Sequence, residues 1–126
     1  MPALTTFLVE DSPVIRHSLI ATLEELVPLR VVDFAEDEPQ AVQWLADPAN
    51  AADLVIIDLF LHSGSGLGVL EAAQRMRTGR VLVVLSNYAT QAMRAQCLAL
   101  GAQRVFDKST EIDALILFCQ TLGRAA

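Results

Sequence analysis

Polar side chains that can bind a metal ion or a phosphoryl group stand directly after the apolar runs of this sequence. Asp58 follows the run Leu54-Val55-Ile56-Ile57 and precedes a loop of serines and glycines at 63–66. Three other apolar runs end in the same way, and the polar residues that follow them are Glu10 with Asp11, Ser86 and Lys108. If they gather at one edge of a sheet, these groups suit Mg²⁺ and a phosphoryl group.

The carboxylates among these residues set the chemistry. Three carboxylates facing one another repel, so they need positive charge from a metal ion or from Lys108. Oxygen ligands without histidine or cysteine favour Mg²⁺ over zinc or copper, and Mg²⁺ leaves coordination positions for phosphate oxygens. An aspartate in such a site can act as a nucleophile and form an aspartyl phosphate. In that scheme the Ser86 hydroxyl donates a hydrogen bond to a phosphoryl oxygen.

Apolar runs and helical patterns alternate along the whole chain. Strands are predicted at 5–9, 31–35, 54–57, 81–85 and 104–106, and helices at 12–27, 36–47, 67–76, 90–100 and 109–123. The strand runs are rich in β-branched residues and hardly alternate with polar ones, so both faces of the sheet are buried. This pattern predicts an α/β domain with a parallel sheet under helices, whose ligands bind beyond the carboxyl ends of the strands.

Local signals give the helix ends. Ser12 followed by Pro13 predicts the start of the first helix, and Pro28 its end. One face of this helix is predicted from its apolar spacing, and consists of Ile15, Leu19, Leu23, Leu26 and Val27. The acidic segment 36–38 is interpreted as a solvated start of the second helix, and the segment 109–111 as the cap of the last one.

Composition narrows the possible partners. The 126 residues, 53% of them hydrophobic, fit one domain with a core at about 5–123 and no output domain. A formal charge of -6 argues against direct binding of nucleic acid or of an anionic membrane. No apolar run approaches the roughly 18 residues of a membrane span. A cytoplasmic location is therefore expected, with Cys97 and Cys119 as reduced thiols in the core.

With these motifs in order, the sequence resembles the receiver domain of two-component response regulators from Phe7 to about Gly123. Glu10-Asp11 matches the acidic pair of that family, and Asp58 in Val55-Ile56-Ile57-Asp58-Leu59 matches the phosphoacceptor. The remaining matches are the loop glycine, the switch hydroxyl and the lysine, which are Gly66, Ser86 and Lys108.

The resemblance implies a flavodoxin-like sheet of five parallel strands in the order 2-1-3-4-5, with five helices. It implies phosphorylation of Asp58 by a sensor histidine kinase or a phosphotransfer protein, with Mg²⁺ as cofactor. Asp11, Asp58 and the backbone carbonyl of Phe60 would bind the metal directly, and Glu10 through water. Phosphorylation would draw Ser86 toward the phosphoryl group and repack the surface of the fourth helix, fifth strand and fifth helix. That surface would bind an unknown downstream protein or a second copy of the chain.

The sequence departs from the family pattern at several positions. Val105 occupies the switch position on the fifth strand, where the family usually has tyrosine or phenylalanine, and strand alternation directs Phe106 to the opposite side. Ser109 replaces a common proline, so a trans Lys108–Ser109 peptide is expected. Residues expected to modulate the mouth of the site are Phe60, Asn87 and Tyr88. The rings of Phe60 and Tyr88 are expected to shield the aspartyl phosphate from water and so to slow autodephosphorylation. His62 is expected to be an exposed loop residue.

Our preferred interpretation is a phosphorylatable single-domain receiver that acts as a protein-binding switch or phosphoryl relay, and not as a dedicated enzyme. One alternative is a receiver excised from a larger transcriptional regulator. Another is a pseudo-receiver, an interaction module that phosphorylation does not switch. A small aspartate-nucleophile phosphatase is disfavoured, because such enzymes typically carry a second aspartate where this chain has Phe60.

Overall fold

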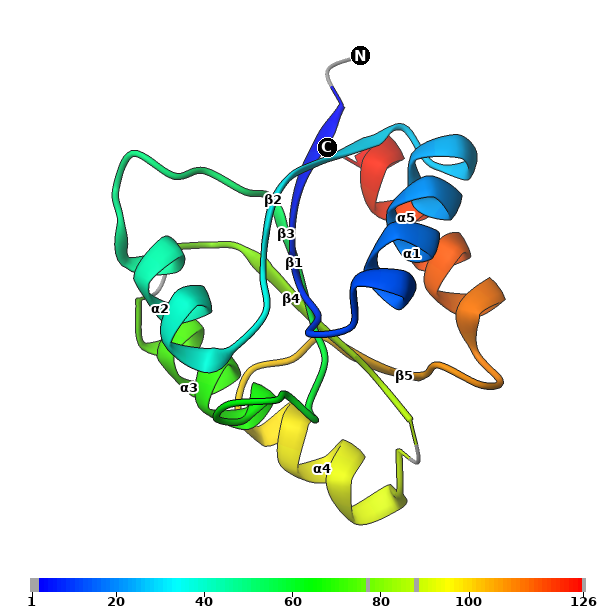
Figure 1. The fold of residues 1–126 in the computed structure, drawn as a ribbon. Helices are drawn as coiled ribbons and strands as arrows, with labels where there is room; N and C mark the ends of the chain where they lie inside the picture. Colours follow the sequence, from blue (N-terminus) through cyan, green and yellow to red (C-terminus); the bar gives the residue numbers. More distant parts are fainter. Residues whose placement is uncertain (1–2, 77, 88, 126) are drawn as a thin grey trace.

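Strands and helices alternate strictly in the computed structural model, which describes residues 3–76, 78–87 and 89–125 (Figure 1). The strands are β1 (Leu4–Val9), β2 (Leu29–Ala35), β3 (Leu54–Ile57), β4 (Val81–Ser86) and β5 (Arg104–Asp107). The helices are α1 (Pro13–Leu26), α2 (Glu38–Ala46), α3 (Gly66–Met76), α4 (Gln91–Ala99) and α5 (Ile112–Ala125). The predicted order of elements is confirmed, although β2 begins two residues earlier than expected.

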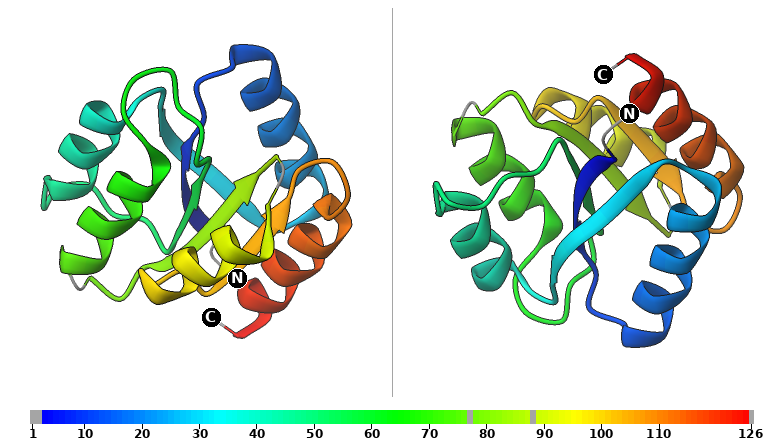
Figure 2. Two further views of the ribbon diagram at one scale, coloured as in Figure 1. Left: turned by 90° about the horizontal axis from the view of Figure 1, so that it is seen from below. Right: turned by 90° about the horizontal axis from the view of Figure 1, so that it is seen from above.

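All strand pairs are parallel, and the strand order is β2-β1-β3-β4-β5. Helices α1 and α5 cover one face of the sheet, and α2, α3 and α4 cover the other (Figure 2). The predicted flavodoxin-like fold is therefore confirmed. In this topology the strand ends that carry the candidate site lie at one edge, opposite the end of the domain where both chain termini lie (Figure 1).

The sheet separates two apolar cores because successive side chains of a strand point to opposite faces. Phe7 and Val9 of β1 belong to the core under α2, α3 and α4, whereas Leu8 belongs to the core under α1 and α5. Every residue of β3 is fully buried, as its uninterrupted apolar run predicts. Trp44 of α2 stacks on Phe7 with ring centroids 4.0 Å apart, so its role in the structure is packing.

Side-chain oxygens cap three of the helices. Ser12 accepts a hydrogen bond from the Ile15 N–H at 3.3 Å, and Asp37 and Thr90 cap α2 and α4 in the same way. The predicted cap at Ser109 is wrong, since α5 begins at Ile112 and the Ser109 side chain bonds to Asp107 instead. The predicted inner face of α1 is also partly wrong. Ile15 and Leu26 are 40% and 49% exposed, and Arg16 is buried beside Leu19 and Leu23.

On both edge strands, side chains form hydrogen bonds with backbone groups that face away from the neighbouring strand. On β2, the Val31 N–H donates to Glu24 Oε2 at 3.0 Å, and the pairing with β1 is irregular between Thr6 and Phe7. On β5, the Val105 carbonyl accepts a hydrogen bond from Arg94 Nη1 at 2.9 Å. These bonds satisfy groups that an edge strand otherwise leaves to solvent or to another strand.

The thiols and backbone agree with the sequence predictions. Cys97 and Cys119 are free and buried, one in each core. Among the described residues no peptide bond is cis, so the Lys108–Ser109 bond is trans as expected. Within the same residues, no helix has both the length and the apolar character that a membrane span needs.

Candidate phosphoacceptor site

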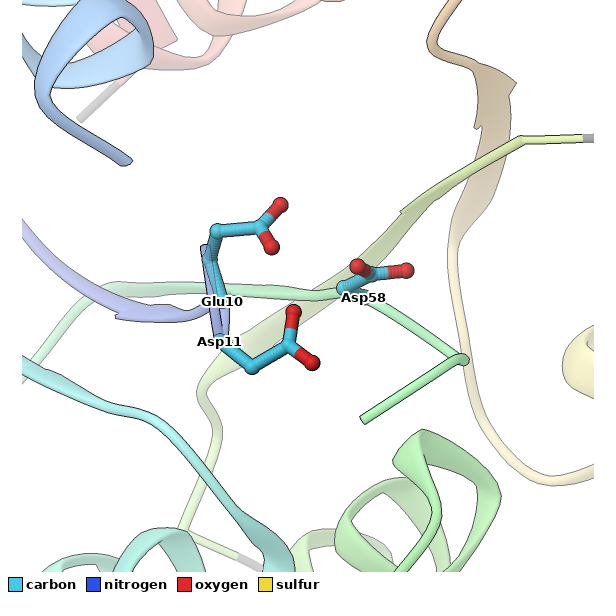
Figure 3. A group of neighbouring side chains, drawn as sticks. All are labelled: Glu10, Asp11 and Asp58. Atoms are coloured by element: carbon cyan, nitrogen blue, oxygen red, sulfur yellow. The ribbon is translucent and has the colours of Figure 1, made fainter. Parts of the chain in front are cut away.

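Three carboxylates meet at the carboxyl ends of β1 and β3. Glu10 and Asp11 follow β1, and their carboxyl groups extend toward Asp58, which follows β3 (Figure 3). One carboxylate oxygen from each lies within 4.8 Å of the others, with Glu10 and Asp58 buried and Asp11 half-buried. The backbone register explains the meeting, because Val9 pairs with Ile57 and the Asp58 N–H donates to the Val9 carbonyl at 3.0 Å. This oxygen-only donor set fits a hard divalent cation such as Mg²⁺.

Lys108 supplies the positive charge that these carboxylates need. It follows β5, and its Nζ donates to Asp58 Oδ2 at 2.9 Å and also to Glu10 Oε1. The side chains of all three residues are at most 11% exposed. Burial acts to lower the pKa of Lys108, but its hydrogen bonds to Glu10 and Asp58 outweigh burial, so the pKa lies above its usual value. Lys108 is therefore charged at neutral pH.

At Glu10, burial has a larger effect on the pKa than the hydrogen bonds do. Burial raises its pKa above the usual range of a glutamate, and the hydrogen bonds that it accepts from Lys108 and from the Ser12 N–H only partly oppose this rise. The neighbouring charge of Asp58 also acts to raise the pKa. A bound divalent cation would favour the charged form of Glu10.

Ser86 completes the row of polar groups at this edge. It ends β4, is fully buried, and its Oγ donates to the Asn87 carbonyl at 3.3 Å. The Ser86 carbonyl accepts a hydrogen bond from the Lys108 N–H at 3.1 Å, which joins the ends of β4 and β5. Ser86 and Lys108 are thus connected through the backbone beside the carboxylates.

The mouth of the site contains one described aromatic ring. Phe60 is 55% exposed, and its N–H donates to Asp58 Oδ1 at 3.2 Å. Asn87 is exposed, and His62 is an exposed loop residue as expected. Tyr88, the second aromatic residue predicted at the mouth, lies outside the described residues. The metal-binding role of the Phe60 carbonyl stays a prediction.

The loop after β3 is held against Asp58 by a close approach that only glycine allows. A Cβ atom on Gly66 would lie 2.1 Å from the Asp58 carbonyl oxygen and 2.6 Å from the Leu59 Cα. The Gly66 N–H donates to the Leu59 carbonyl at 2.9 Å, which closes the loop. Gly66 therefore fixes the backbone that carries the candidate phosphoacceptor.

Two residues that support the site were not identified from the sequence. Glu38, interpreted as part of a solvated helix start, is half-buried and accepts a hydrogen bond from the Ser65 N–H at 2.8 Å. Arg16 donates to the Glu10 carbonyl at 3.0 Å and stacks over the Phe34 ring at 3.9 Å. Its spacing from Leu19 and Leu23 on one helical face was the available signal.

Comparison with known proteins agrees with this geometry. The model of the response regulator receiver domain family matches residues 6–119. The chain belongs to this family. No curated protein sequence gave a significant match.

Solved structures of receiver domains share the fold. The Francisella response regulator 1452 receiver domain superposes with a TM-score of 0.83 at 19% identity, covering 96% of this chain and 97% of that one. The response regulator domain of Thermotoga maritima CheB gives 0.80 at 19%, covering 98% and 96%. A Burkholderia pseudomallei response regulator with a phosphorylated aspartic acid, calcium ion and citrate gives 0.79 at 21%, covering 96% and 69%.

At the predicted switch position of this receiver domain, an apolar side chain is combined with a hydrogen-bonded carbonyl. Val105 is buried in the core under α2, α3 and α4, and Phe106 lies in the opposite core with its ring 6.0 Å from that of Phe118. The predicted alternation of these two side chains is confirmed. Arg94 of α4 donates from Nη1 to the Val105 carbonyl, and its Nη2 pairs with Glu111.

Proposed function

We propose that Asp58 of this receiver domain accepts a phosphoryl group in the presence of Mg²⁺, so that the chain acts as a protein-binding switch or a phosphoryl relay. The observation that carries the proposal is the buried Asp58 carboxylate at the end of β3, 2.9 Å from Lys108 Nζ and beside Glu10 and Asp11. The domain is not a dedicated enzyme in this proposal, because its product is its own modified side chain.

In the proposed reaction, a carboxylate oxygen of Asp58 attacks the phosphorus of the donor. The bond from phosphorus to the donor's leaving group breaks, the leaving group takes the electron pair, and an aspartyl phosphate forms. Mg²⁺ bound by Asp11, Asp58 and the Phe60 carbonyl, with Glu10 acting through water, would supply positive charge to the phosphoryl oxygens. Lys108 is already placed to add a second positive charge. The Ser86 hydroxyl would exchange its bond to Asn87 for one to a phosphoryl oxygen.

The proposed phosphoryl donor is a sensor histidine kinase or a phosphotransfer protein. A groove of about 400 Å³ lies between α1 and α5, and its lining includes Val14, Ile15, Leu85 and Lys108. Val14 is 79% exposed, and the neighbouring Pro13 and His17 are exposed too. An apolar surface beside the site lysine suits a partner that presents a phosphohistidine while packing against α1. The proposal places this exchange in the cytoplasm, where buried thiols stay reduced.

The proposed output surface is formed by α4, β5 and α5. Leu98 of α4 and Leu117 of α5 are 52% and 62% exposed and would provide apolar contacts to a partner. A downstream protein or a second copy of the chain would bind there after Ser86 has moved. The proposal does not include direct binding of nucleic acid or membrane, in keeping with the charge of -6.

Incubation with acetyl phosphate and MgCl₂ tests the proposed function. Wild-type protein is expected to gain the mass of one phosphoryl group in intact-mass spectrometry, and Asp58→Asn is expected to gain none, because its amide is not a nucleophile. EDTA should suppress the gain. Absence of any mass gain in the wild type would instead support the pseudo-receiver interpretation.

A second prediction concerns loss of the phosphoryl group. Phe60→Asn is expected to speed autodephosphorylation several-fold, because a polar side chain at the mouth can hold the attacking water that an exposed ring excludes. Release of inorganic phosphate from the phosphorylated protein measures this rate. Leu117→Asn is the matched control, since it changes an equally exposed apolar residue on α5, and it should leave the rate unchanged. Equal rates in both variants would contradict a shielding role for Phe60.

A further inference from the structure

The carboxylate of Asp107 joins two segments that flank the site. Asp107 is the last residue of β5 and directly precedes Lys108. Its Oδ1 accepts hydrogen bonds from the Ser109 N–H at 2.8 Å and from the Ser109 hydroxyl. Its Oδ2 accepts one from the Ala89 N–H at 3.3 Å. One side chain therefore ties the turn after Lys108 to the loop between β4 and α4.

The backbone of Asp107 is held just as firmly. Its N–H donates to Glu111 Oε1 at 2.9 Å, and its carbonyl accepts the Glu111 N–H at 2.8 Å. Asp107 thus closes the turn 107–111 from both its backbone and its side chain, and Lys108 lies inside this turn. The Asp107 carboxylate binds Ser109 and Ala89, whereas the Lys108 ammonium binds Glu10 and Asp58, so the two side chains have separate partners.

The β4–α4 loop is held from a second side as well. The Ala89 carbonyl accepts a hydrogen bond from Arg94 Nε at 3.1 Å, while the Ala89 N–H is bound by Asp107. Arg94 pairs with Glu111, which in turn binds Asp107. These four residues form a closed network, so the loop that follows Ser86 and the turn that carries Lys108 form one hydrogen-bonded unit.

Asp107 is charged under ordinary conditions. The hydrogen bonds from the hydroxyl and the N–H of Ser109 lower its pKa below the usual range of an aspartate. Hydrogen bonds to a charged acceptor are stronger than those between neutral groups. The carboxylate is therefore well suited to hold a turn in place.

We propose that Asp107 is a positioning residue, which holds Lys108 against Asp58 and couples the β4–α4 loop to the turn before α5. This inference rests on the proposed function only where it concerns phosphoryl transfer. The placement of Lys108 can be tested without phosphorylation, because Lys108 is the only lysine in the sequence. Modification of a lysine amine by an acylating reagent therefore reports on this one side chain, once peptide mapping has separated it from the N-terminal amine.

The labelling experiment compares four proteins. Asp107→Ala removes both acceptors and is expected to speed acylation of Lys108 about tenfold, since bonds to a charged acceptor are lost. Asp107→Asn keeps an oxygen for Ser109 but loses the acceptor for the Ala89 N–H, so its rate should lie between those of Asp107→Ala and the wild type. Asp113→Ala is the control, because it removes an exposed carboxylate from the first turn of α5. It should not change the rate.

Global unfolding is separated from local release by the buried thiols Cys97 and Cys119. Thiol labelling should stay at the wild-type rate in Asp107→Ala if only the turn is released. Should that variant unfold, Ser109→Ala provides the test, because it removes only the hydroxyl bond and should give a smaller acceleration. Wild-type acylation rates in folded Asp107→Ala or in Ser109→Ala would overturn the proposal.

Phosphoryl uptake from acetyl phosphate provides a second test of the proposed role of Asp107. Asp107→Ala should take up the phosphoryl group about tenfold more slowly than the wild type, and Asp107→Asn should recover part of the rate. If the wild type takes up no phosphoryl group, the proposed function fails while the labelling result still tests the positioning role. If phosphoryl uptake is normal in Asp107→Ala although acylation of Lys108 is faster, the placement of Lys108 does not limit phosphoryl transfer. The proposed link between Asp107 and phosphoryl transfer is then overturned.

Discussion

Lys108→Met is expected to lower the free energy of unfolding by about 3 kcal/mol in the absence of divalent ions, because it leaves buried carboxylates without their partner. The Lys108 ammonium binds both Glu10 and Asp58, and all three side chains are almost completely buried. Without it, the pKa of Glu10, which burial already raises, should rise further. Urea denaturation in EDTA measures the loss.

Divalent ions should reverse part of this loss. MgCl₂ is expected to stabilise Lys108→Met more than the wild type, since the metal then replaces the positive charge that the carboxylates have lost. Phosphoryl uptake should nevertheless fall strongly, because the transferred group loses one of its two cations. Arg30→Met, which removes an exposed cation from β2, is the control and should change neither property. Equal behaviour of the two variants would contradict the role given to Lys108.

Gly66→Ala is expected to lower the free energy of unfolding by about 3 kcal/mol, at the upper end of the usual cost of overpacking. The added Cβ would lie 2.1 Å from the Asp58 carbonyl oxygen, and neither atom can rotate away, because the backbone fixes the position of both. Relief of the clash must displace Asp58 itself, so phosphoryl uptake should fall as well.

Gly123→Ala is the matched control for this substitution. Gly123 lies in α5, and the nearest atom to a Cβ there is Pro28 Cγ at an ordinary 3.7 Å. Alanine is the better helix former by roughly 0.5–1 kcal/mol, so this variant should be as stable as the wild type or slightly more stable. Thermal or urea denaturation of both variants measures the difference. A Gly66→Ala protein of wild-type stability would show that the loop can move away from Asp58.

The fold was predictable because local signals and burial agree. The run Leu54-Val55-Ile56-Ile57 has no polar member, and the structure buries all four residues completely. Proline and cap residues mark the start of α1 at Ser12 and Pro13, as the sequence predicted. The meeting of Glu10, Asp11 and Asp58 follows from parallel strands whose carboxyl ends share an edge. Their roles in phosphoryl transfer stay predictions.

The supporting contacts were not predictable, because they join segments far apart in the sequence. Glu38 and Ser65 are separated by 27 positions, and their hydrogen bond depends on how α2 and the loop after β3 are placed. The error at Ser109 has a related cause. Its hydroxyl could accept a hydrogen bond from an N–H of the helix start or donate one to a nearby acceptor, and it donates to the charged Asp107 carboxylate.

The treatment of the sheet edges has a consequence for association between molecules. An unprotected edge strand can pair with a strand from another chain, and repeated pairing of this kind produces fibrils. Here the Glu24 carboxylate accepts a hydrogen bond from the Val31 N–H of β2, and Arg94 donates one to the Val105 carbonyl of β5. A neighbouring chain would have to displace these side chains before it could add a strand. Strand addition at either edge is therefore disfavoured at these two positions.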